Sequence, residues 1–180
     1  YDSNRGRVYM YTFNDGVITG GTGSYFGDIV TSIAAADMNS DGRTDLIVSA
    51  DGYSTNTGRV YIFYNDGSIP TTAATADVII TGETTNNIFG QSFAFGDWNA
   101  DGRVDMAVGA LYYSTNTGRV YIFYNDGSIP TTAATADVII TGETTNNYFG
   151  TTLSSGDLNT DGKTDLVVGA SGYSTSTGRA

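Results

Sequence analysis

The sequence contains no cysteine and no histidine among its 180 residues. Without them there can be no disulfide, no thiolate ligand and no imidazole base, so zinc sites and the usual nucleophile–base pairs are excluded. The only lysine is Lys163, and no apolar run approaches the ~20 residues that a membrane-spanning helix needs. We therefore expect neither an enzyme nor insertion into a membrane.

Positive charge is also scarce, with 8 Lys and Arg against 19 Asp and Glu and a formal net charge of −11. Nucleic-acid binding needs a basic face, so this composition argues against it. Charged residues make up only 15% of the chain, which is rich in Thr, Ser, Asn, Gly and Tyr. We interpret this balance as that of an extracellular or cell-surface, secreted β protein.

Much of the acidity lies in three segments with the pattern D-x-N-x-D-G-x-x-D, at residues 37–45, 97–105 and 157–165. Oxygen-bearing side chains stand at positions 1, 3, 5 and 9. The glycine at position 6 permits the sharp turn that aims the carbonyl of position 7 at a hard cation. Carboxylates this close together repel one another unless a cation lies between them. Each segment therefore predicts one structural Ca²⁺ site, with extracellular-grade affinity on the order of 10⁻⁴–10⁻³ M.

The predicted ligands follow the same pattern in all three segments, with four side chains and one backbone carbonyl in each. The first set is Asp37, Asn39, Asp41, Asp45 and the Arg43 carbonyl. The second set is Asp97, Asn99, Asp101, Asp105 and the Arg103 carbonyl. The third set is Asp157, Asn159, Asp161, Asp165 and the Lys163 carbonyl.

Two other interpretations of these segments are weaker. Plain turns use the same residue types, but three copies in one register favour a metal site. EF-hand and dockerin loops need an acidic residue near position 12 and flanking helices. Position 12 is here Val48, Val108 or Val168, each inside an apolar run, which rules that alternative out.

The chain is an internal repeat with a period of 60 residues, as the spacing of Arg59, Arg119 and Arg179 illustrates. Residues 53–87 and 113–147 are identical at all 35 positions. The interval from Arg7 to Arg59 is shorter, at 52 residues, and Asn14-Asp15-Gly16 predicts a tight hairpin turn there.

Each repeat predicts four short strands, which in the second copy are residues 91–96, 104–110, 119–124 and 137–141. The third alternates β-branched and aromatic residues with period 2. No helical period extends beyond one turn, and residues 131–136 could form a helical turn at most. Four strands per repeat predict an all-β fold of four-stranded antiparallel β-propeller-type blades.

The combination of Phe89-Gly90, the acidic segment 97–105 and Val108-Gly109-Ala110 resembles the FG-GAP repeat of integrin α-subunit β-propellers and their bacterial relatives. The other copies carry Phe26-Gly27 with Val48-Ser49-Ala50, and Phe149-Gly150 with Val168-Gly169-Ala170. The resemblance implies a four-stranded blade whose Ca²⁺ loop joins the first two strands. No copy has the Pro of "GAP", and three repeats fall short of the roughly 4–8 blades of known propellers.

The repeats divide residues 1–180, read as a single FG-GAP-type domain, into three blade equivalents. Two complete blades are expected at about 27–82 and 90–142, with half-blades at about 1–20 and 150–180. Three blades are too few to close a ring, and unpaired strand edges attract further strands. The sequence therefore predicts head-to-tail assembly of copies of this chain into a ring or filament.

These features favour a structural or adhesive repeat protein whose partner is a second copy of itself. Two alternatives stay open. One is a carbohydrate-binding propeller module, with Tyr112, Tyr113 and Trp98 as stacking faces for glycans, or with surface proteins as partners. The other is a piece of a longer integrin-like propeller.

Overall fold

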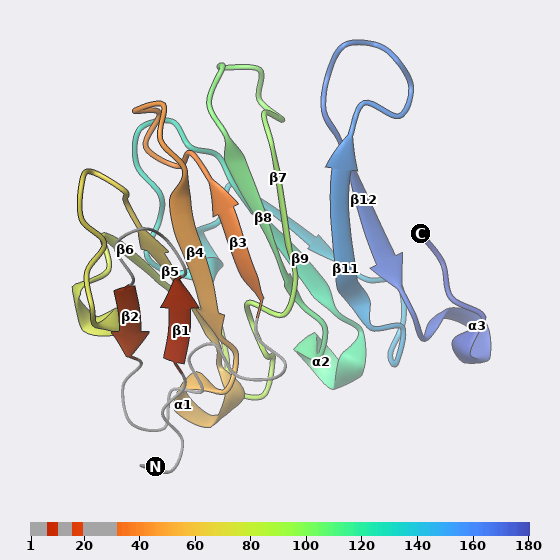
Figure 1. Ribbon diagram of the computed structural model, residues 1–180. Coiled ribbons are helices and arrows are strands. Elements are labelled where there is room, and N and C mark those ends of the chain that lie inside the picture. Colours follow the sequence, from red (N-terminus) through yellow and green to blue (C-terminus); the bar gives the residue numbers. More distant parts are fainter. Residues whose placement is uncertain (1–6, 11–15, 20–31) are drawn as a thin grey trace.

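The computed structural model describes residues 7–10, 16–19 and 32–180, and every strand pair in it is antiparallel (Figure 1). The described strands form two four-stranded and two two-stranded sheets. This confirms the predicted fold class of propeller-type blades. The predicted turn at Asn14-Asp15 and the Phe26-Gly27 pair lie outside the described residues.

The two four-stranded sheets have the same strand order, in which sequence neighbours are also neighbours in space. The first blade consists of β3 (Ile33–Ala36), β4 (Asp45–Ala50), β5 (Arg59–Phe63) and β6 (Val78–Thr81). The second blade consists of β7 (Phe93–Gly96), β8 (Asp105–Ala110), β9 (Arg119–Phe123) and β10 (Val138–Thr141).

The two-stranded sheets are the N-terminal hairpin and the C-terminal half-blade. The half-blade pairs β11 (Phe149–Gly156) with β12 (Asp165–Ala170), the equivalents of the first two strands of a blade. The N-terminal hairpin pairs β1 (Arg7–Met10) with β2 (Gly16–Thr19), and Arg7 faces Thr19 as Arg59 faces Thr81 in the first blade. The hairpin thus reproduces the register of a third and fourth strand.

Helical structure is limited to single turns. Three four-residue turns follow the second strand of each unit: α1 (Tyr53–Asn56), α2 (Tyr113–Asn116) and α3 (Tyr173–Ser176). In α1 and α2 several residues have left-handed backbone angles, so neither could continue as a right-handed helix. Two 3₁₀ turns, Ala73–Thr75 and Ala133–Thr135, precede the fourth strands. No helix among the described residues is long and apolar enough to cross a membrane.

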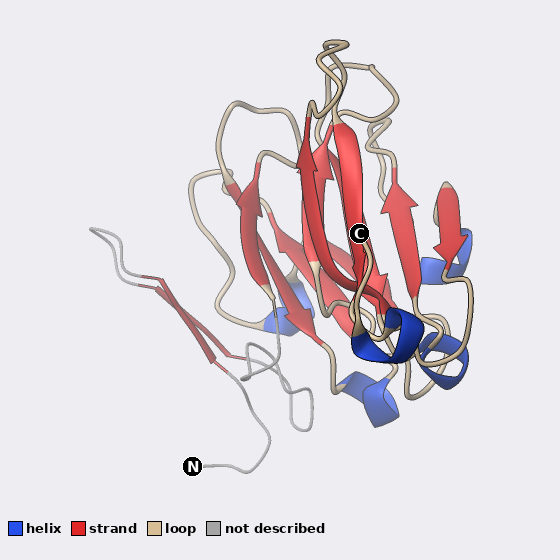
Figure 2. Cartoon of the chain, turned by 90° about the vertical axis from the view of Figure 1, so that its right-hand side faces the viewer, coloured by secondary structure: helices blue, strands red, loops and turns tan. Residues whose placement is uncertain are grey.

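The strands lie in stacked sheets (Figure 2). The largest cluster of buried side chains lies between the first and the second blade. Phe89 is fully buried there and meets the rings of Tyr121 and Phe123 edge-on, with ring centroids 5.5 and 6.3 Å apart. A smaller cluster joins the second blade to the half-blade.

Close backbone approach explains the glycines that precede β5 and β9. Gly58 lies beside Phe89, and Gly118 lies beside Phe149, each through an isolated parallel bridge. A Cβ at either glycine would overlap the backbone of that phenylalanine, and both glycines have positive φ. The sequence pairs Phe-Gly and Gly-Arg are therefore the two sides of one contact between consecutive units.

Candidate metal centre

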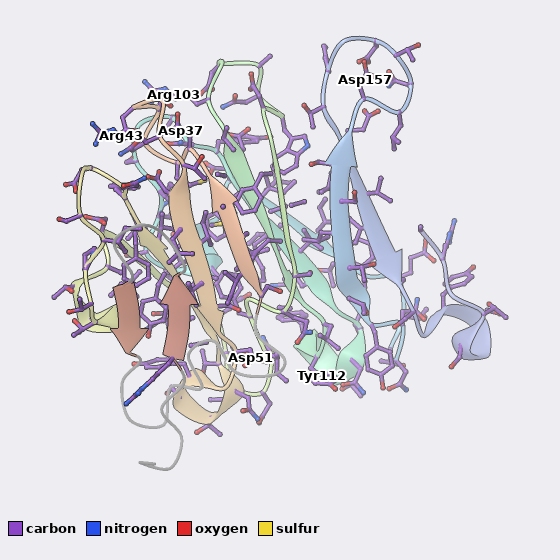
Figure 3. The ribbon with its side chains drawn as sticks, in the orientation of Figure 1. Asp37, Arg43, Asp51, Arg103, Tyr112 and Asp157 are labelled. Carbon is purple, nitrogen blue, oxygen red and sulfur yellow. The ribbon has the colours of Figure 1, made fainter. Side chains whose placement is uncertain are left out.

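The three acidic segments form equivalent loops at one end of the sheets, opposite the three helical turns (Figure 3). We call them loop 1 (residues 37–45), loop 2 (97–105) and loop 3 (157–165). Each joins the first and second strands of its unit, between β3 and β4, β7 and β8, or β11 and β12. This is the position that the FG-GAP resemblance implies for a Ca²⁺ loop.

All three loops share one network of side-chain to backbone hydrogen bonds. In loop 1 the amide of Asp41 donates to Asp37 Oδ1 (3.2 Å) and Asn39 Oδ1 (3.0 Å). The amide of Gly42 donates to Asp37 Oδ2 (2.9 Å), and that of Arg43 donates to Asp41 Oδ1 (2.8 Å). The same four bonds recur in loops 2 and 3. The side-chain oxygens of positions 1 and 3 therefore turn toward the same point in every loop.

The position-6 glycines make this geometry possible. Gly42, Gly102 and Gly162 have φ of 82°, 83° and 84°, a left-handed conformation that costs other residues energy. The turn lets the amides of positions 5, 6 and 7 bond the side chains of positions 1, 3 and 5 in each loop.

The position-9 aspartate lies at the base of the loop and is buried in the first two units. Asp45 accepts hydrogen bonds from the amides of Met38 (2.7 Å) and Asn65 (2.8 Å). Asp105 accepts the equivalent bonds from Trp98 (2.9 Å) and Asn125 (2.8 Å). Asp165 is only partly buried, and within the described part of the chain it accepts only the first of these bonds, from Leu158 (2.9 Å).

The donor chemistry of the loops fits Ca²⁺, although the acids are not gathered in advance. Within residues 7–10, 16–19 and 32–180, no three His, Cys, Asp or Glu side chains are grouped so that they could hold a metal ion. Each predicted set adds an asparagine and a backbone carbonyl to its three carboxylates, and all of these donors are hard oxygens of the kind Ca²⁺ prefers. An ion bound there would neutralise carboxylate charge, while the loop's own amides already hold positions 1, 3 and 5 in place.

A charged contact between units was not predicted from the sequence. Glu83, just after β6, lies 2.7 Å from Arg119 Nη1 and accepts a hydrogen bond of 2.7 Å from the Tyr121 hydroxyl. Burial raises the pKa of Tyr121 well above its ordinary value of 10.0, and the bond to Glu83 raises it further. The same pair recurs as Glu143 and Arg179, at 3.0 Å. One feature of the sequence could have indicated this contact. Glu83 and Glu143 are the chain's only glutamates, and their spacing of 60 residues is that of Arg119 and Arg179.

Of the three aromatic residues predicted as stacking faces, only Tyr112 is well exposed, at 40%. Its ring meets that of Tyr148 edge-on, with centroids 5.9 Å apart. The Arg119 guanidinium lies 3.5 Å above the centre of the Tyr113 ring. The indole nitrogen of Trp98 is buried and, among the described residues, has no hydrogen-bond partner. Tyr113 and Trp98 are therefore poorly placed to stack on a ligand.

A cavity of about 340 Å³ lies beside the half-blade, where the third strand of a complete blade would run. Its walls come from β10 and the segment after it, from β11 and β12, and from α3 and the residues after it. They include Ile140, Glu143, Phe149, Val168, Tyr173 and Arg179. Arg179 already pairs with Ala170 of β12 through an antiparallel bridge, as Arg119 pairs with Ala110 in the second blade.

Comparison with known proteins agrees with the repeat pattern. The FG-GAP repeat matches residues 30–63, 89–123 and 149–180, which confirms the resemblance seen in the sequence. The chain is 35% identical over 154 residues to phosphatidylinositol-glycan-specific phospholipase D of Bos taurus, covering 77% of this chain and 18% of that protein. It is 35% identical to integrin alpha-IIb of Mus musculus over 164 residues, and 33% identical to integrin alpha-5 of Xenopus laevis over 167 residues. Each integrin match covers 84% of this chain and 15% of the relative. The chain thus spans less than a fifth of these relatives.

Proposed function

Because this chain belongs to the FG-GAP repeat family, we propose that it is an extracellular, Ca²⁺-stabilised structural or adhesive module that works by assembly through its incomplete blade. The observation that carries the proposal is the half-blade β11–β12, which has only the first two strands of a unit. Two strands alone are marginally stable in water, whereas four strands on a neighbouring blade are stable.

The burial of equivalent residues supports this proposal. Met106, Ala107 and Val108 of β8 are fully buried. Their equivalents in β12 are Leu166, Val167 and Val168, and all three are only partly buried. Ile140 of β10 is 37% exposed, whereas its equivalent in β6, Ile80, is fully buried. Apolar surface is therefore left uncovered at the place where the next strands would pack.

The N-terminal hairpin of a second copy has the right register to fill this place. Strands β1 and β2 pair as third and fourth strands of a blade do, and Val8 occupies the repeat position of Ala180. A second copy's β1 could therefore continue the pairing that Arg179 begins on β12. Contacts of this head-to-tail kind close into a ring or extend as a filament, depending on the rotation between copies.

A longer polypeptide offers a competing source of the missing strands. The relatives are more than five times longer than the matched region, so further repeats of the same chain could complete the blade. In that case the module is a segment of one propeller, and its adhesive role depends on the whole ring. The name phospholipase D describes a relative of which only 18% is matched, so it assigns no catalysis to this chain.

Carbohydrate binding is the second candidate function. The observation that favours it is the exposed ring of Tyr112, which lies beside the ring of Tyr148. Nearby, the side-chain amide of Asn116 donates a hydrogen bond of 3.0 Å to Asn146. Aromatic faces with neighbouring amides suit sugar rings, which need stacking and hydrogen bonds together. Screening a glycan array with native chain and with Tyr112→Ala would test this candidate.

Light scattering of the native polypeptide, with Ca²⁺ and with chelator, tests the main proposal. We expect particles larger than one chain of 18.9 kDa in Ca²⁺, and we expect deletion of residues 1–20 to abolish association. Chelator should also lower the melting temperature, because the loop carboxylates then repel one another. A stable monomer at every concentration would refute assembly, and an unchanged melting temperature after calcium depletion would refute the structural role of Ca²⁺.

A further inference from the structure

Loops 1 and 2 are connected by a continuous row of buried hydrogen bonds. Met38, at position 2 of loop 1, uses its amide to bond Asp45 Oδ2 at the base of the same loop (2.7 Å). Its carbonyl accepts a bond of 2.8 Å from the side-chain amide of Asn125. The backbone amide of Asn125 in turn donates to Asp105 Oδ1, at the base of loop 2 (2.8 Å). A single residue of the second blade therefore contacts both loops.

Every group in this row is removed from solvent. Met38 and Asp45 are each 1% exposed, Asn125 is 4% exposed and Asp105 is fully buried. Buried hydrogen bonds are costly to leave unmade, so a shift at one end of the row is resisted by the other end. Met38 also stands between Asp37 and Asn39, the position-1 and position-3 ligands predicted for loop 1.

The first blade provides a matched comparison at Asn65, which has the same repeat position as Asn125. Its backbone amide bonds Asp45 as that of Asn125 bonds Asp105. Its side chain, however, reaches only Thr44 O of its own loop, at 3.3 Å, and among the described residues it contacts no second loop. At the base of loop 3, Asp165 accepts a bond from the Leu158 amide, and among the described residues no asparagine bonds it.

We propose that Asn125 is a positioning residue that couples the Ca²⁺ sites of loops 1 and 2, so that these two sites fill cooperatively. This inference rests on the proposed binding of Ca²⁺. An ion in loop 2 fixes Asp105 and with it Asn125, whose side chain then holds Met38 between two ligands of loop 1. Ordering loop 1 around its own ion then costs less, because the ion in loop 2 has already fixed part of the row. This produces positive cooperativity.

The position-6 glycines make it possible to observe each site separately in the full-length chain. The amides of Gly42, Gly102 and Gly162 each donate to the position-1 aspartate of their own loop. Their NMR signals should therefore move when that aspartate ligates an ion. Ca²⁺ titration monitored at these three signals gives one midpoint for each loop.

The experiment is a double-mutant cycle between Asp101→Ala, which disables site 2, and Asn125→Ala. In the native background, Asp101→Ala should raise the Gly42 midpoint at least about fivefold, the lower end of typical coupling between sites. In the Asn125→Ala background the same change should raise it less than about twofold, because only screened charge effects remain. Asn65→Ala is the matched control, and the fivefold effect should persist in it.

The outcomes separate this inference from the proposed function. If none of the glycine signals responds to Ca²⁺, both the proposed binding and the coupling are wrong. If all three respond but Asp101→Ala has the same effect with and without Asn125→Ala, Ca²⁺ binding stands and the coupling through Asn125 is wrong. In Ca²⁺-free protein, Asn125→Ala should also speed hydrogen exchange of the Met38 amide, whereas Asn65→Ala should leave that exchange rate closer to native.

Discussion

Residues 53–87 and 113–147 have the same sequence but different surroundings, which separates what the local sequence determines from what a neighbour determines. The strands begin and end alike in both copies, and Arg59 and Arg119 each donate to the threonine opposite, at 3.0 and 2.9 Å. Burial differs sharply: Ile80 is fully buried between two blades, and Ile140 is 37% exposed beside the half-blade. Secondary structure is thus local, whereas burial depends on whether a complete unit follows.

Truncating the two equivalent isoleucines should give the largest difference. Ile80→Ala removes a fully buried side chain and should lower the free energy of unfolding by about 2–5 kcal/mol. Ile140→Ala removes a partly exposed one and should cost about 1 kcal/mol or less in dilute solution. Urea denaturation of both variants measures the difference. Equal losses of unfolding free energy in the two variants would mean that Ile140 is already buried in solution. If the loss for Ile140→Ala rises with protein concentration, a second copy of the chain buries it.

The charged contact between units should give the next largest effect. Arg119 and Glu83 keep only 16% and 26% of their side chains exposed, and Glu83 also accepts the Tyr121 hydroxyl bond. Glu83→Gln should therefore cost about 1.5–3 kcal/mol, the range for hydrogen bonds to charged groups. Arg179 and Glu143 are 54% and 64% exposed, so Glu143→Gln should cost less than about 1 kcal/mol. Thermal unfolding of this matched pair checks the order, and a larger cost for Glu143→Gln would contradict it.

Much of this architecture can be predicted from the sequence because its causes are local. Period-2 alternation predicts a third strand at 119–124, and the structure has it at Arg119–Phe123. The Asx-rich loops follow from side chains that bond amides two to five residues away. The second copy predicts a first strand that begins after the Phe-Gly pair. In the half-blade Phe149-Gly150 instead lies within β11, because a shift in register after Phe149 extends the pairing.

The contacts between units could not be predicted in the same way. Glu83 meets Arg119 and Asn125 meets Met38 across 36 and 87 residues of sequence. No periodic pattern within one blade indicates which charged or amide side chain faces the next blade. The repeat spacing shows that such contacts recur, but only the packed blades show which residues make them. Whether the loops bind Ca²⁺ stays a prediction.

Alkaline pH should give the smallest effect in this comparison, and it depends on Tyr121 and its equivalent Tyr61. Burial raises the pKa of both hydroxyls above 10.0, and the neighbouring arginine, Arg119 or Arg59, partly offsets the rise at each. Glu83 raises the pKa of Tyr121 further. A pKa raised in the folded state means that this part of the stability is fully present below pH 10 and is lost as pH rises, because the unfolded chain ionises first. For a tyrosine that stays protonated only when folded, the loss is roughly 1.4 kcal/mol at pH 11.

Tyr121→Phe should therefore remove more of the decline in unfolding free energy between about pH 9 and pH 11 than Tyr61→Phe does. Each variant is measured by urea denaturation against its own value near pH 8, which cancels the fixed cost of losing the hydroxyl. In the Glu83→Gln variant, the decline in unfolding free energy between about pH 9 and pH 11 should be closer to that of Tyr121→Phe. The reason is that the neutral amide no longer favours the protonated phenol. Identical slopes for the two Tyr→Phe variants would mean that Glu83 does not distinguish these otherwise identical segments.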